Sequence, residues 1–186
     1  MTVAHAALAE ALRAEAAEAV LLVYSPRTMP KDAGAEPPLL RPEERLASVG
    51  AWCASRPGFH PAICSHGLYV DQAEAASRAF PAAEIVLGLG ADKLLQLFDT
   101  SWYGEGARAL DRLFQRAVVA YAPRAEREVE GIIAEHGRWA SRVRPLALPE
   151  GLRHVSSSEV RRRLRAGEDW ATWVPTEVSR FLPRFP

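Results

Sequence analysis

The sequence predicts an α/β fold in which helices flank an open parallel sheet. Short continuous apolar runs at 19–24, 84–90 and 117–122 alternate along the chain with longer amphipathic segments. Apolar runs of this length are typical of strands buried on both faces, and their alternation with helices is typical of the α/β class. A chain of 186 residues is long enough to bury a core without disulfides or a bound metal, so we expect residues 1–186 to form a single domain.

The overall charge excludes two classes of partner. Lys plus Arg and Asp plus Glu both number 23, so the formal net charge is zero and no global field recruits nucleic acid or a membrane. The chain has two cysteines and no long apolar run, which favours a cytoplasmic protein. The spacing of these cysteines and their neighbouring histidines fits no zinc pattern, so we predict no metal site made of protein side chains. The sequence leaves open whether the protein forms a homo-oligomer.

An amphipathic helix is expected at the start of the chain, with Thr2 as its N-cap and His5 projecting from the same end. The apolar stripe that we expect to be buried consists of Val3, Ala7, Leu8, Ala11 and Leu12. The strand at 19–24 is expected to be buried on both faces. A long loop at 25–42 follows, which carries Lys31; loops of this length are usually functional.

The middle of the chain continues the alternation. A helix at 43–55 is expected to bury Leu46, Val49 and Gly50. A strand at 60–64, a helix at 71–79 and a strand at 84–90 come next.

The turn after the strand at 84–90 carries a carboxylate at the edge where open α/β sheets bind ligands. Gly88-Leu89-Gly90 precedes Asp92, but Lys93 stands where a dinucleotide fingerprint has its third glycine, so a nicotinamide-dependent dehydrogenase is excluded. Asp92 is placed to accept ribose hydroxyls. A second role, as the cap of a helix that starts at Lys93, is equally open.

An aromatic loop at 98–106 follows this turn, and Trp102 or Tyr103 could either stack on a flat ring or cover the core. We expect a helix at 107–116 and a strand at 117–122, after which Arg124 reaches the same sheet edge and could bind phosphate. A helix at 125–139, a strand at 143–148 and a short helix near the end complete the elements.

The stretch 155–164 combines hydroxyl groups with a cationic helix. Ser156 and Glu159 have the spacing of a capping box, which leaves the positive end of the helix dipole pointing outward. Ser157 and Ser158 add hydroxyl donors there, and Arg161 lies one turn further on. This pattern suits an anion site, and it also suits an ordinary capped surface helix.

Together these motifs resemble a known enzyme family. Thr2-Val3-Ala4-His5 and Ser156-Ser157-Ser158-Glu159-Val160-Arg161 are similar to the early Thr/His-x-x-His pair and the late Ser-Ser-Thr-x-x-Arg motif of the nicotinamide or nicotinate mononucleotide adenylyltransferases. The segment 88–92, Trp102, the segment 118–124 and Val174-Pro175 extend the resemblance along nearly the whole chain.

The resemblance implies a Rossmann-like sheet of the nucleotidyltransferase type. In that family a glycine-containing first strand in the centre of the sheet precedes the early pair, and the sequence has no such strand before Thr2. We therefore expect the first strand to be missing and the ladder edges of its two neighbours to be unpaired. An additional segment upstream is the expected explanation. Ala4 for glycine and Ser158 for threonine are milder departures.

The implied reaction is adenylyl transfer from ATP to nicotinate or nicotinamide mononucleotide, with release of pyrophosphate. Magnesium would be held mainly by ATP phosphates and water. The catalytic residues would be His5 and Arg161. The ATP-binding residues would be Thr2, His5, Gly90, Asp92, Ser156, Ser157, Ser158 and Arg161, and the mononucleotide-binding residues Lys31, Trp102, Tyr103 and Arg124. Two alternatives are another phosphorylated acceptor, such as phosphopantetheine, and a nucleotide-binding remnant without catalysis.

Overall fold

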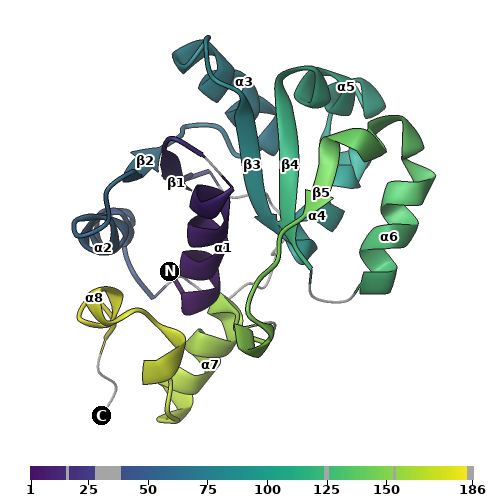
Figure 1. The fold of residues 1–186 in the computed structure, drawn as a ribbon. Helices are drawn as coiled ribbons and strands as arrows, with labels where there is room; N and C mark the ends of the chain where they lie inside the picture. Colours follow the sequence, from purple (N-terminus) through teal and green to yellow (C-terminus); the bar gives the residue numbers. More distant parts are fainter. Residues whose placement is uncertain (16, 28–38, 124–125, 153, 184–186) are drawn as a thin grey trace. The chain divides into compact units, whose positions relative to one another are not determined.

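The computed structural model describes residues 1–15, 17–27, 39–123, 126–152 and 154–183, with backbone only for 126–130. The chain divides into two compact units, Met1–Ser65 with Leu148–Pro186 and His66–Ala147. Each unit contains one parallel sheet with helices beside it (Figure 1), so the predicted α/β class is confirmed. Among the described helices, none has the length and apolar character needed to cross a membrane.

The first unit is built around a two-stranded parallel sheet. Strand β1 pairs with β2 from Val20↔Phe59 to Tyr24↔Ile63. The elements of this unit are α1 (Val3–Ala14), β1 (Val20–Tyr24), α2 (Pro42–Cys53), β2 (Phe59–Ile63), η3 (Glu150–Leu152), α7 (Ser157–Ala166), η4 (Ala171–Trp173) and α8 (Thr176–Ser179).

The core of the first unit joins segments from both ends of the chain. Buried side chains from α1, β1, α2, α7 and the C-terminal segment form one cluster: Ala6, Ala9, Val20, Trp52, Cys53, Val160, Leu164, Val174 and Val178. The helices α1 and α7, about 150 residues apart in sequence, therefore pack on a common core.

The buried faces of α1 and α2 differ from those predicted. Helix α1 buries Ala6 and Ala9 in place of the expected stripe of Val3, Ala7, Leu8, Ala11 and Leu12. In α2 the buried residues are Ser48, Trp52 and Cys53, whereas Leu46, Val49 and Gly50 are only partly buried. The large Trp52 ring sets the rotation of α2, because it fills the most volume when it faces the core.

Strand β1 is not buried on both faces, so that prediction was wrong. Val20 is buried, but Leu21 and Val23 are 39% and 47% exposed. Alternate residues of a strand point to opposite faces, and the core cluster covers only the face of Val20 and Leu22. The strand is apolar throughout, yet only one of its two faces is covered by the core.

An ion pair links α8 to the segment that follows α2. Arg56 donates to Glu177 across 2.8 Å, and its guanidinium also lies 4.5 Å above the Trp52 ring. The bond from Arg56 holds the pKa of Glu177 below its ordinary value. Both side chains are about one-third exposed, so the pair contributes modestly to stability.

We expect Glu177→Gln to lower the free energy of unfolding by about 0.5–1 kcal/mol at neutral pH. A carboxylate with a depressed folded-state pKa stabilises the fold above its unfolded pKa of about 4.3, and this contribution is lost as pH falls through the folded value. Urea unfolding between pH 3 and 8 should therefore show the difference between the two proteins disappearing in acid. A difference that does not change with pH would contradict the assignment.

The second unit is built around a three-stranded parallel sheet of order β3-β4-β5. Ile85↔Ala117 begins the first pairing and Val119↔Val143 begins the second. The elements of this unit are α3 (Tyr69–Ala79), β3 (Ile85–Gly90), α4 (Ala91–Phe98), η1 (Thr100–Trp102), α5 (Ala107–Arg116), β4 (Ala117–Ala122), α6 (Glu126–Glu135), η2 (Gly137–Arg142) and β5 (Val143–Pro145).

The central strand β4 carries the core of the second unit. Five of its six residues are buried, which confirms the prediction of a strand covered on both faces. The predicted helix at 125–139 instead ends at Glu135, and the more tightly wound η2 begins at Gly137. The predicted strand at 143–148 is shorter, because the ladder ends after Pro145 with one further bond from Leu146 N to Tyr121 O.

Candidate functional site

The serine triplet lies at the start of α7, as predicted. Ser156 is the N-cap, and its hydroxyl oxygen accepts a hydrogen bond from Glu159 N at 3.1 Å. In the expected capping box, the Glu159 carboxylate would accept a hydrogen bond from the backbone nitrogen of Ser156. It instead accepts hydrogen bonds from Arg162 and Arg163 further along the helix. The helix ends at Gly167, which has φ of +67°, a conformation that favours glycine.

Arg162 and Arg163 of α7 are paired with acidic groups. Arg162 forms bonds of 2.7–2.9 Å to both Glu159 and Glu168. Arg163 donates to Glu159 and to Asp169 O, each at 3.0 Å, and lies 4.3 Å above the Trp173 ring. These bonds lower the pKa of Glu159 to about 2, so it is ionised at neutral pH and neutralises the arginine charge beside it.

Arg161 stands in contrast to its two neighbours. Its Nη2 donates to Ser158 Oγ at 3.1 Å, and no carboxylate among the described residues pairs with it. Its Nε is buried and has no hydrogen-bond partner in the described part of the chain. A buried donor without a partner costs about 1–3 kcal/mol, so the described contacts leave part of the Arg161 guanidinium unsatisfied. Arg161, Ser158 and the positive end of α7 thus form a local cationic site.

Thr2 and His5 form a hydrogen-bonded pair at the start of α1. Thr2 N donates to His5 Nδ1 at 3.2 Å, and Thr2 Oγ1 lies 2.7 Å from the same nitrogen. Because Nδ1 accepts from the backbone, the neutral ring carries its proton on Nε2. Thr2 is only 2% exposed, whereas His5 is an exposed residue. This geometry suits a role for Thr2 in orienting the His5 ring.

The two helix starts belong to the same unit and share its core. Ala6 follows His5 directly, Val160 precedes Arg161 directly, and both apolar residues belong to one buried cluster. The structure therefore brings the first turns of α1 and α7 to a common core, although about 150 residues separate them. Six predicted ATP-binding residues lie at these two helix starts or, for Arg161, one turn further on: Thr2, His5, Ser156, Ser157, Ser158 and Arg161.

The other predicted ligand residues lie in the second unit, where β3 runs directly into α4. Gly90 is the N-cap of α4, so the helix begins at Ala91 and not at Lys93. The alternative role of Asp92 as the helix cap is therefore wrong, since Asp92 stands inside the first turn with an exposed side chain. A Cβ atom added to Gly90 would meet nothing within 4 Å, so its own surroundings do not require glycine there.

The two aromatic candidates differ in their surroundings. Tyr103 is 7% exposed, and its hydroxyl donates to Leu97 O at 2.9 Å, so its ring belongs to the core of the second unit. Burial raises the pKa of Tyr103. Trp102 packs only partly against that core, and its Nε1 is buried without a partner among the described residues. Of the two, Trp102 is the better candidate for contact with a ligand.

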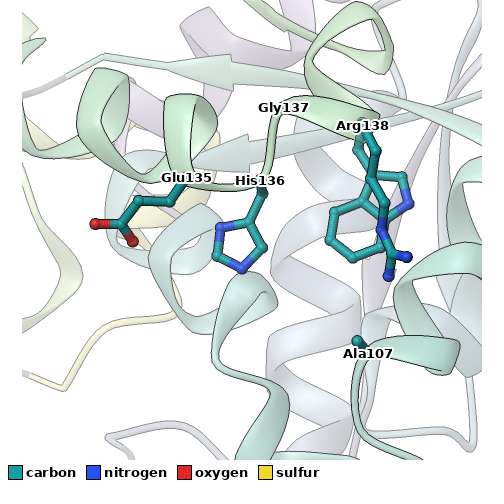
Figure 2. A pocket seen from close by; sticks show the side chains of 6 residues that line it. Ala107, Glu135, His136, Gly137 and Arg138 are labelled. Atoms are coloured by element: carbon teal, nitrogen blue, oxygen red, sulfur yellow. The ribbon is translucent and has the colours of Figure 1, made fainter.

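A shallow cavity of about 380 Å³ in the second unit was not anticipated from the sequence (Figure 2). It lies beside Ala107, Glu135, His136, Gly137, Arg138 and Trp139. Arg138 lies 4.0 Å above the Trp139 ring and pairs with Asp111, which also accepts from the Trp139 indole. These contacts satisfy Arg138 internally, and the cavity includes none of the predicted site residues.

Two predicted mononucleotide-binding residues, Lys31 and Arg124, lie outside the described residues. Within the described part of the chain, no group of three or more His, Cys, Asp or Glu side chains could hold a metal ion. No protein-family model matches this chain, and no curated protein matches it.

Proposed function

We propose that the protein transfers the adenylyl group of ATP to nicotinate or nicotinamide mononucleotide, forming the dinucleotide and pyrophosphate. One observation carries this proposal: among the described residues, Arg161 is the arginine of the 161–163 triplet that no carboxylate pairs with, and its buried Nε, beside a serine-rich helix start, has no partner there. Such a site suits the β- and γ-phosphates of a nucleotide better than a neutral ligand. The resemblance of the late motif to the adenylyltransferases agrees with this chemistry.

The proposed mechanism relies on alignment and positive charge. The 5′-phosphate of the mononucleotide attacks the α-phosphorus, the bond to the bridging oxygen breaks, and charge moves onto pyrophosphate. Arg161, the Ser157 and Ser158 hydroxyl groups and the first N–H groups of α7 would stabilise that leaving group. His5, whose Nδ1 accepts from Thr2, would donate from Nε2 to an ATP phosphate.

The remaining roles follow the resemblance. Asp92 would accept the ribose hydroxyls, and Trp102 would stack on the pyridine ring. Magnesium would neutralise phosphate charge and would be held mainly by the phosphates and water.

We also propose that the two sheets derive from a nucleotidyltransferase-type sheet whose first strand is missing. The common order of such doubly wound sheets is 3-2-1-4-5-6. Without strand 1, this order leaves a pair, 3-2, and a triple, 4-5-6. The described strands pair in this way, as β2-β1 and β3-β4-β5, with β1 and β3 each at the edge of its own sheet.

The test is to incubate the purified chain with ATP, magnesium and each mononucleotide separately, and to follow dinucleotide and pyrophosphate by chromatography. We expect dinucleotide in at least one reaction, and the better acceptor identifies the substrate. Product with phosphopantetheine alone would support the alternative acceptor. A folded chain that binds ATP but forms no dinucleotide would support the alternative of a nucleotide-binding remnant without catalysis. Activity in a chain extended at its N-terminus by the family's first strand would instead support the adenylyltransferase.

A further inference from the structure

The acidic partners of the α7 arginines control how much positive charge the start of this helix presents. Three consecutive arginines, Arg161 to Arg163, add three positive charges to α7 close to its start, and uncompensated charge there strengthens the attraction of a polyphosphate. The structure pairs Arg162 with both Glu159 and Glu168, and Arg163 with Glu159. One glutamate therefore compensates two of the three guanidinium groups.

We propose that Glu159 is a specificity-determining residue of this anion site, because its contacts to Arg162 and Arg163 leave Arg161 as the one arginine of the three that no described carboxylate compensates. This inference rests on the proposed function. A site with one such arginine holds the pyrophosphate portion of ATP in place but releases pyrophosphate more readily than a site with two or three. Glu159 limits product affinity in this way without touching the phosphates.

The hydrogen bonds of α7 allow the carboxylate to be tested separately from the helix cap. Ser156 Oγ accepts from the backbone nitrogen of Glu159, so Glu159→Gln leaves the capping bond in place. Arg163 would then lose its carboxylate partner, whereas Arg162 would keep Glu168. The number of uncompensated arginines in the triplet rises from one to two.

The matched control is Glu168→Gln. Glu168 pairs with Arg162, which keeps its two bonds to Glu159 after this substitution. The control removes the same charge, but from beyond the C-terminal end of α7, and leaves the count of uncompensated arginines unchanged. An effect caused only by the change in the net charge of the chain would appear equally in both variants.

The experiment measures binding of inorganic pyrophosphate, ATP and AMP to the whole chain and both variants by calorimetry, at several salt concentrations. We expect Glu159→Gln to bind pyrophosphate and ATP about two- to fivefold more tightly, with a steeper salt dependence and a smaller change for AMP. Glu168→Gln should change these affinities less than about twofold. Circular dichroism and thermal unfolding confirm that both variants are folded.

Two results would overturn the inference and leave the proposed function intact: unchanged or weaker pyrophosphate binding by Glu159→Gln, or equal tightening in both variants, while the unmodified chain binds ATP. Failure of the unmodified, folded chain to bind both ATP and pyrophosphate would overturn the phosphate assignment itself, and the role of Glu159 with it.

Discussion

Replacing Arg161 with alanine is expected to lower turnover about 10²- to 10³-fold, the usual cost of one lost donor to charge that develops in the transition state. Arg161 donates to Ser158 Oγ, and its buried Nε has no partner among the described residues, so the substitution removes positive charge from the proposed leaving-group site. The affinity for the mononucleotide should change little, because in the proposed site its ring and ribose would bind to other groups. Steady-state measurement of kcat and of KM for each substrate separates the two effects.

Arg162→Ala is the matched control for this prediction. Arg162 is the next residue on the same helix, but its charge is paired with Glu159 and Glu168. Its loss should lower turnover less than about tenfold, since the proposed phosphate donor remains in place. Equal effects of the two substitutions would mean that general helix charge, and not Arg161 itself, assists the reaction.

Replacing His5 with alanine is also expected to reduce turnover about 10²- to 10³-fold and to leave mononucleotide affinity nearly unchanged. The His5 ring is held by Thr2 through Nδ1, which places the proton of the neutral ring on Nε2. Chromatographic rate measurements at saturating mononucleotide would detect this loss. If neither His5→Ala nor Arg161→Ala changes turnover, the assignment of phosphate contacts to these helix starts is wrong.

Thr2→Val gives an intermediate test of the same pair. Valine preserves the shape of this buried residue but removes the hydroxyl oxygen that lies 2.7 Å from His5 Nδ1. The bond from the backbone nitrogen of residue 2 remains, so the ring is only partly released. We expect a roughly tenfold lower kcat, less than for His5→Ala, because orientation and not the donor itself is affected. A loss as large as that of His5→Ala would indicate that Thr2 contacts ATP directly.

Much of the local structure could be predicted from the sequence, because it depends on neighbouring residues. The apolar run at 117–122 gave β4 with its bounds, and Ser156 was identified as an N-cap from its position three residues before Glu159. The Thr2–His5 pair was likewise visible, since residues three apart lie on one face of a helix start.

Side-chain environments were less accessible from the sequence. The exposure of Leu21 and Val23 could not be inferred from an apolar run, because composition does not reveal whether a neighbour covers the second face of a strand. Tyr103 and Trp102 are adjacent aromatic residues, yet only Tyr103 donates its polar group to a main-chain oxygen within the core. The difference depends on the local backbone path around Leu97.

The sequence by itself determined the α/β class, most helices and strands, and the two helix starts that carry the candidate phosphate contacts. Only the tertiary structure decided that α1 and α7 share one core and that Arg161, unlike Arg162 and Arg163, has no acidic partner in the described part of the chain. The physical reason is that helices, strands and caps depend on residues a few positions apart. Burial and charge pairing depend on which distant groups fill the surrounding space, as Arg56 and Glu177 do across 121 positions.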